Sequence, residues 1–364
     1  MKKGSLVLMM LSIAFAVSCK KDNAAPAPAP AVPTDLSVSG TANCYIVSAP
    51  GSYMFKAVKG NSDTSVGTVA KAEVLWESYG TDATPSVGSL VAKVAVPDAN
   101  PGVITFSTPE TLENGNALIV AKDASGNILW SWHIWICKDY DAQATAQDYY
   151  NESGTMMDRN LGATSAVPGQ ASALGLLYQW GRKDPFLNSS SINQLTPAKA
   201  TSDFRTVASS ATTGTVEYVT QHPTTFVTDS RDWLHPQNDN LWKSPKTIYD
   251  PCPPGWQVPY EKDGQLIWLE AKKGKTKVCS FDKTVKGINF TGKLGEAASI
   301  WYPAAGYRRD NGSWDLVGNA GYWWSCSISG TDAASAQIDD EYYDDMAVLP
   351  SYRVFGQSVR CCKE

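Results

Sequence analysis

The chain has 364 residues, of which 43% are hydrophobic and 18% are charged. This length suggests two folded units, and the composition excludes both a disordered chain and a polytopic membrane protein. Lys and Arg number 31 against 36 Asp and Glu, a net charge of −5 that excludes the basic face on which nucleic-acid binding depends. The chain holds 13 Trp and 16 Tyr but 3 His, so its composition favours binding surfaces over proton-transfer chemistry.

Residues 1–18 have the pattern of a signal peptide. A short basic start precedes an apolar run over residues 4–17 that is too short to be a resident membrane helix. The small residues before Cys19 resemble the lipobox of bacterial lipoproteins, which implies that Cys19 becomes the new N-terminus and carries acyl chains. Each buried CH₂ of those chains contributes about 0.8 kcal/mol to membrane attachment. The alternative is an ordinary secretory signal that leaves Cys19 as an incidental thiol.

Residues 19–36 are expected to form a lipidated, Pro-rich tether. Residues 20–23 (KKDN) resemble the short signals that send some lipoproteins of Gram-negative bacteria to the outer face of the membrane. In residues 24–33 (AAPAPAPAVP), the repeated Pro favours an extended, semi-rigid spacer at about 3.1 Å per residue. We therefore expect a protein anchored by its lipid to the outer membrane and exposed at the cell surface.

Residues 37–137 are predicted to form an immunoglobulin-like β-sandwich. Turn signals separate seven short β-rich runs, and this number of strands over about a hundred residues is typical of that fold. The runs are Cys44–Ser48, Tyr53–Val58, Val69–Trp76, Leu90–Val96, Val103–Ser107, Ala117–Lys122 and Ile128–Cys137.

The last of these runs alternates between two faces, one of which is expected to be core. One face carries Trp130, Trp132, Ile134 and Ile136, and the other carries Leu129, Ser131, His133 and Trp135. His133 is interpreted as a packed or edge histidine rather than a metal ligand, because no second His or carboxylate stands at metal-ligand spacing.

Residues 138–154 are read as a linker, and residues 155–364 as an α+β domain with long loops. Helical spacing and a following Gly predict a helix over residues 171–180, and a second helix is predicted over residues 262–272. The Ser- and Thr-rich stretch 188–250 is expected to be a loop region packed onto the body of the domain.

Five motifs in this second domain occur in a recognisable order. They are residues 157–163 (MDRNLGA), 175–186 (GLLYQWGRKDPF), 250–259 (DPCPPGWQVP), 321–325 (GYWWS) and 356–361 (GQSVRC). Together they resemble the Fibrobacter succinogenes major paralogous (FISUMP) domain family of bacterial surface lipoproteins, and more loosely the C-type-lectin-like fold. The resemblance implies an extracytoplasmic binding or adhesive module and does not imply a reaction.

The cysteines suggest an oxidising compartment. The family pattern implies a disulfide between Cys252 and Cys361, although the neighbouring Cys362 leaves the choice of partner open. Two further candidate bridges join Cys44 with Cys137 and Cys279 with Cys326. A catalytic cysteine is not expected, because few His residues are present to hold a thiolate.

Acidic residues crowd the region before the last strands, including Asp339, Asp340, Asp344 and Asp345. Their oxygens are the ligands that Ca²⁺ prefers, but a hydrated acidic loop explains them equally well, and no EF-hand spacing is present. The leading expectation is therefore no cofactor, with Ca²⁺ as an alternative. The same acids suggest a glycosidase pair as a further alternative.

Aromatic residues are the best candidates for ligand binding, since exposed rings stack on sugars or anchor protein partners. The candidates are Trp301, Tyr307, Trp314, Trp323 and Trp324. Trp323 and Trp324 are neighbours on a predicted strand, so their side chains point to opposite faces and one of them is expected to be core. The alternative for each ring is burial.

Three functional hypotheses follow. The first is a non-catalytic, surface-displayed lipoprotein that binds a glycan or protein ligand. The second is a fimbrial or surface-assembly component in which a sandwich edge accepts a partner's strand. The third is a glycan-active enzyme.

Overall fold

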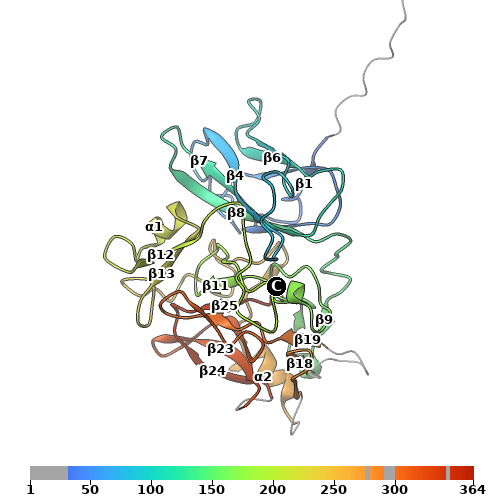
Figure 1. Ribbon diagram of the computed structural model, residues 1–364. Coiled ribbons are helices and arrows are strands. Elements are labelled where there is room, and N and C mark those ends of the chain that lie inside the picture. The colour runs from blue at the N-terminus through green and yellow to red at the C-terminus, as the bar shows by residue number, and fades with distance from the viewer. Residues whose placement is uncertain (1–31, 275–278, 291–299, 342–344) are drawn as a thin grey trace, which may run out of the picture. The chain divides into compact units, whose positions relative to one another are not determined.

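The computed structural model describes residues 32–274, 279–290, 300–341 and 345–364. Residues Pro33–Glu364 form one compact unit. The fold is mostly β, with 36% of residues in strands and 6% in helices (Figure 1). No helix among the described residues is both long enough and apolar enough to cross a bilayer. The predicted signal peptide, Cys19 and residues 20–31 of the tether lie outside the described residues.

The N-terminal part is a sandwich of two four-stranded sheets. The first has the order β1 (Thr34–Asp35), β3 (Ser52–Lys56), β6 (Val103–Ser107) and β5 (Lys93–Ala95), and the second has the order β2 (Cys44–Val47), β8 (Ile128–Ile136), β7 (Gly115–Lys122) and β4 (Lys71–Ser78). Between the sheets, the ring of Phe55 lies 5.2 Å from that of Tyr45 and 5.1 Å from that of Trp132. Each of the seven predicted runs overlaps one of these strands.

Strand β8 is buried on both of its faces. Trp132 and Ile134 lie in the sandwich core, as the alternating pattern predicts. On the opposite face, the Ser131 hydroxyl donates to Asp184 at 2.6 Å, and the Trp135 indole donates to the carbonyl of Ala163 at 3.1 Å. The sequence predicted one core face, but residues from the second part of the chain cover the other face as well.

The edge strand β4 is also covered by the second part of the chain. The amide of Lys199 donates to the carbonyl of Thr81 at 2.8 Å, and the amide of Thr201 donates to that of Glu77 at 3.0 Å. The Ser78 hydroxyl donates to the carbonyl of Lys199 at 2.6 Å. Residues 199–201 thus satisfy backbone groups that an open sheet edge leaves unpaired.

The second part of the chain is built on two larger sheets and several small ones. The seven-stranded sheet has the order β21 (Trp314–Asp315), β20 (Tyr307–Arg308), β25 (Gly356–Ser358), β22 (Ala320–Ser329), β23 (Asp332–Asp339) and β24 (Ala347–Ser351), with β11 (Leu177–Gln179) also paired to β25. A four-stranded sheet has the order β14 (Trp256–Gln257), β26 (Cys362–Lys363), β10 (Thr155–Met156) and β9 (Gln147–Asp148). The small sheets pair β12 (Arg205–Ala208) with β13 (Thr225–Thr228), β15 (Glu261–Lys262) with β16 (Gln265–Leu266), and β17 (Phe281–Asp282), β18 (Gly287–Phe290) and β19 (Ile300–Pro303) with one another.

The helices are short: η1 (Tyr150–Glu152), η2 (Ala171–Ala173), α1 (Val216–Gln221) and α2 (Ile267–Lys272). The helix predicted over residues 171–180 is wrong. Gly175 has φ +73°, which ends any helix there, and the following residues pair with β25 as strand β11. Helix α2 occupies only the end of the second predicted helix, because a hairpin of β15 and β16 precedes it. Helix α1 lies within the predicted loop region and packs beside β8 (Figure 1).

His133 on the covered face of β8 makes stability depend on pH. Asn116 donates its amide to the carbonyl of Gly162, so its oxygen accepts from His133 Nε2 at 2.8 Å, and Nδ1 has no hydrogen-bond partner in the described part of the chain. Burial lowers the pKa of His133 from 6.5 to about 3.

Below pH 6.5 the unfolded chain therefore binds a proton at His133 that the folded protein does not. We expect this residue alone to reduce the free energy of unfolding by about 2 to 3 kcal/mol between pH 6.5 and 4.5. Urea titrations of the wild type and of His133→Gln, which keeps a donor for Asn116, measure this difference. Equal pH slopes for the two proteins would contradict it.

Candidate ligand-binding site

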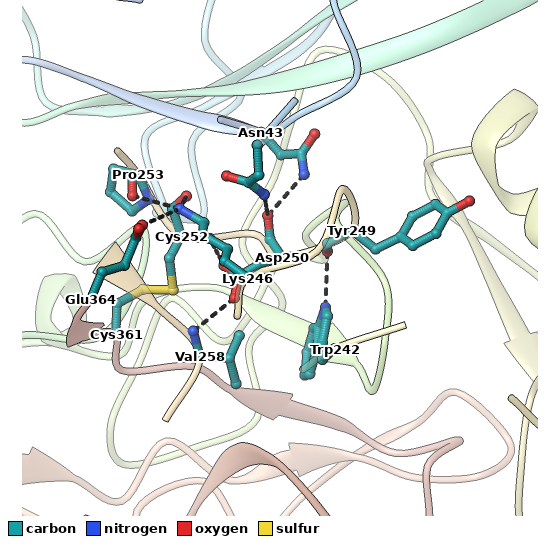
Figure 2. The surroundings of a disulfide bond; sticks show 11 residues. Asn43, Trp242, Lys246, Tyr249, Asp250, Cys252, Pro253, Val258, Cys361 and Glu364 are labelled. Carbon is teal, nitrogen blue, oxygen red and sulfur yellow. Dashed lines mark hydrogen bonds and ion pairs between the residues drawn. A yellow bond between two sulfur atoms is a disulfide. The ribbon is translucent and has the colours of Figure 1, made fainter. Parts of the chain in front are cut away.

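A cross-linked turn joins the middle of the chain to its end (Figure 2). Cys252 and Cys361 form a disulfide with their Cα atoms 6.0 Å apart, across a sequence separation of 109. This is the pairing that the family resemblance implies. Inside the turn, the buried carboxylate of Asp250 accepts from the amides of Cys252 at 2.8 Å and Val258 at 2.9 Å. Burial raises the pKa of Asp250 to about 6.

Asn43 connects this turn to the sandwich. Its side-chain amide donates at 2.8 Å to the carbonyl of Asp250 (Figure 2) and at 2.8 Å to that of Ile248. Its oxygen accepts from the Trp130 indole at 2.9 Å. On the far side of the turn, Lys246 donates to two backbone carbonyls and pairs with Glu364 at 3.3 Å. The turn is therefore a structural junction whose polar groups are used internally.

The other two candidate disulfides are not formed. Cys44 and Cys137 are both buried free thiols. Strands β2 and β8 run parallel with Cys44 opposite His133, so Cys137 lies four residues farther along, roughly 13 Å away at 3.3 Å per residue. This separation exceeds what a disulfide spans.

Cys279 and Cys326 are likewise buried free thiols that pack in different apolar clusters, and Cys362 is a fifth free thiol. Cys279 instead makes a hydrogen bond to the carboxylate of Asp345 at 3.0 Å.

Three of the aromatic candidates are core residues. Trp323 and Trp324 are each 0% exposed, and Trp301 is 4% exposed. Trp323 and Trp324 do point to opposite faces, but an apolar cluster covers each face, and their indoles donate to Asn160 and to the carbonyl of Tyr178, respectively. The expectation that either ring could meet a ligand is corrected, because β22 lies between two cores.

Tyr307 and Trp314 are only half-buried. The ring of Tyr307 packs against Tyr322 and Phe355, with centroids 4.9 and 5.1 Å away. Trp314 lies on β21 directly opposite Arg308 on β20, and its indole nitrogen donates to the carbonyl of Leu187 at 3.3 Å. Trp314 is the candidate that lines a pocket.

This pocket, called the Trp314 pocket below, has a volume of about 270 Å³. Its walls come from the sandwich, from the segment that covers β4, and from the β20–β21 hairpin. The lining residues are Thr84, Leu187, Ala198, Lys199, Ala200, Ser202, Asp203, Phe204, Arg308 and Trp314. The arrangement combines aromatic walls with hydroxyls and charges of both signs, as in sites that bind small polar ligands.

Arg308 is the most unusual group in the Trp314 pocket. It is 3% exposed, and its guanidinium lies 4.4 Å from the centroid of Trp314, 4.5 Å from Phe226 and 5.4 Å from Phe186. Its Nε donates to the carbonyl of Gly312 at 3.0 Å, and among the described residues no carboxylate pairs with it. Burial, together with the like charge of Arg182, lowers the pKa of Arg308 to about 10, so it is a cation near neutral pH.

The described acidic residues do not converge on one point. Asp340 pairs with Lys283 at 3.5 Å and Asp345 with Lys272 at 3.0 Å. Asp339 accepts from a nearby backbone amide at 2.8 Å, while Asp344 lies outside the described residues. Within the part of the chain that the structure describes, no three His, Cys, Asp or Glu residues form a group that could hold a metal ion.

The sequence prediction missed Arg308, although a signal for it was present. Asn311 and Gly312 mark a hairpin turn, which places Arg308 and Trp314 on neighbouring strands, and the structure pairs these two residues directly. Gly312 has φ +82°, a backbone conformation that favours glycine. No sequence pattern places Phe204 and Lys199 in the pocket, because they lie on a loop that is distant from the hairpin in the sequence.

Comparisons of the chain with family models, with curated proteins and with solved structures find no match. The resemblance to the FISUMP family therefore rests on the five sequence motifs.

Loss of the disulfide between Cys252 and Cys361 is expected to lower the stability of the protein strongly. Replacing both cysteines, as Cys252→Ala with Cys361→Ala, frees a loop of about a hundred residues, and we expect it to lower the free energy of unfolding by about 4 to 5 kcal/mol. Urea denaturation of the oxidised wild type and of the double variant measures this. Unchanged unfolding midpoints would contradict it. Cys137→Ser is the control, because Cys137 lies outside the disulfide. This variant should not lose as much free energy of unfolding as the double variant.

Proposed function

We propose that this protein is a lipid-anchored, externally displayed binding protein that holds a glycan or protein ligand in the Trp314 pocket without transforming it. The observation that carries the proposal is the indole of Trp314, which is half-buried, fixed by its hydrogen bond to Leu187 and placed at a concave surface. A ring held in one orientation loses little conformational entropy when it binds, so it suits recognition. The lipobox and the Pro-rich tether support display away from the membrane.

The finer fold assignment is part of this proposal: an immunoglobulin-like sandwich followed by a FISUMP, C-type-lectin-like domain. Its support is that the five motifs lie close together. The Trp180 indole donates to the carbonyl of Ser325 at 3.0 Å, and Arg360 donates to the side chain of Asn160 at 3.1 Å. The disulfide joins Cys252 of the third motif to Cys361 of the fifth. Such mutual packing explains why these motifs occur together in one sequence.

The fimbrial alternative requires a free sandwich edge that can accept a strand. The C-terminal end of strand β4 does not offer one, because Thr201 and Ser202 bond to the backbone of Glu77 and Leu75. We therefore favour binding in the Trp314 pocket over assembly through this edge.

Lipid attachment predicts a change of location on substitution of Cys19. The Cys19→Ser variant has no thiol to acylate, so we expect it to leave the membrane fraction, whereas the wild type stays there until detergent is added. Fractionation with mass spectrometry of the mature N-terminus measures this. A wild-type protein with a free Cys19 thiol and no acyl chain would contradict the anchor.

If the Trp314 pocket is the binding site, ligand binding depends on the half-buried ring of Trp314. In a screen of glycans and surface proteins, we expect Trp314→Ala to weaken binding of the ligand by about tenfold or more. Tyr352→Ala is the matched control, since Tyr352 is an exposed ring (40%) outside the pocket and should leave binding unchanged. A protein that binds nothing in the screen, or that binds equally well as Trp314→Ala, would refute the proposed site.

A further inference from the structure

Arg308 differs from the other buried cations in how its charge is satisfied. Lys183 pairs with Asp184 at 2.8 Å, and Arg353 pairs with Asp239 at 2.6 Å. The other two such residues among those described, Arg182 and Arg360, each donate through a terminal nitrogen to a side-chain oxygen and to at least one backbone carbonyl, although each keeps one buried nitrogen without a partner. Arg308 makes its one hydrogen bond through Nε, which leaves both terminal nitrogens without a hydrogen-bond partner among the described residues.

A cation removed from water is costly unless something completes its hydrogen bonds. The terminal nitrogens of Arg308 are not among the fully buried atoms that lack a partner, so they are accessible from the pocket that Arg308 lines. The three rings around Arg308 offset part of the cost, because an aromatic face attracts a guanidinium. They cannot accept the hydrogen bonds of the two terminal nitrogens as a carboxylate does. The planar fork of a guanidinium matches the two oxygens of a carboxylate, so a ligand that carries one would complete the site.

The rest of the pocket lining indicates what carries that carboxylate. Phe204 and Trp314 offer apolar surface for the C–H faces of a sugar ring. Thr84 and Ser202 also line the pocket, and the Ser202 hydroxyl, which donates to the carbonyl of Leu75, keeps its oxygen as an acceptor. Lys199 adds a second cation, but Asp203 adds a negative charge, which disfavours a highly charged anion such as a sulfated or phosphorylated chain. A volume of about 270 Å³ suits one compact ring rather than an extended peptide.

We propose that the Trp314 pocket binds a carboxylate-bearing sugar, a uronic acid or a related acidic saccharide, with the carboxylate on Arg308 and the ring against Trp314 and Phe204. This inference rests on the proposed function and names its ligand class. Arg308 is the specificity-determining residue, because it distinguishes an acidic sugar from a neutral one. Trp314 contributes contact area for both kinds of sugar.

The first test compares two ligands on the wild-type protein. The probes are a uronic-acid oligosaccharide and the same oligosaccharide after its carboxyl groups are reduced to alcohols, which keeps size and linkage and removes the charge. Isothermal titration calorimetry should give at least about tenfold tighter binding of the acidic form. Equal affinity, or stronger binding of a sulfated sugar or an acidic peptide, would overturn the inference and leave the proposed binding function intact. Failure of every glycan and protein to bind would instead refute the proposed function itself.

The second test compares two neighbouring arginines. Arg308→Gln should remove the preference for the acidic sugar, and Arg308→Lys should weaken it, because a lysine keeps the charge without the fork. Arg309→Gln is the matched control, since Arg309 is exposed and pairs with Asp315 at 3.1 Å. Circular dichroism shows whether each variant is folded. If Arg308→Gln does not fold, the comparison of the two ligands on the wild-type protein decides whether the pocket prefers the acidic sugar. An unchanged preference in folded Arg308→Gln would overturn the inference.

Discussion

Strand β8 must be covered on both faces, and the rest of the structure depends on this constraint. Its outer face carries Ser131, His133 and Trp135, each buried to 99% or more. These groups have hydrogen-bonding atoms that need partners when water is excluded. The second part of the chain supplies the partners of Ser131 and Trp135 through Asp184 and the carbonyl of Ala163, whereas His133 bonds to Asn116 of the sandwich itself. The contact of Asn43 with the cross-linked turn adds a further connection. The sandwich therefore shares a core with the second part of the chain and is not a separate domain.

This shared core also builds the candidate site. Residues 199–201 follow the edge of β4, and the chain then continues through Phe204, which packs against Trp76 of the sandwich with ring centroids 5.7 Å apart. That path brings Lys199 and Phe204 to the β20–β21 hairpin, where Arg308 and Trp314 complete the pocket. The pocket thus exists only where the second part of the chain lies against the sandwich, and neither part contains all of its walls.

The sequence predicted the local features well and the long-range ones poorly. Alternation with period two located the sandwich strands and the opposite orientations of Trp323 and Trp324, because strand faces follow directly from sequence. It could not tell that both faces of β8 and of β22 are buried, since burial depends on segments far away along the chain. The helix predicted at residues 171–180 failed for the same reason: pairing of β11 with β25 outweighs helical spacing. The place of Arg308 near Trp314 could have been inferred from the hairpin sequence, whereas the places of Phe204 and Lys199 in the pocket could not.

A crystal structure of the protein soaked with glucuronate would show whether Arg308 holds a carboxylate in the shared pocket. We expect density for the sugar beside Trp314, with its two carboxylate oxygens within hydrogen-bonding distance of the terminal nitrogens of Arg308, and residues 199–201 running along β4. A sugar bound elsewhere, an Arg308 whose terminal nitrogens meet a carboxylate of the protein instead, or a sandwich whose outer β8 face is open to solvent would contradict it.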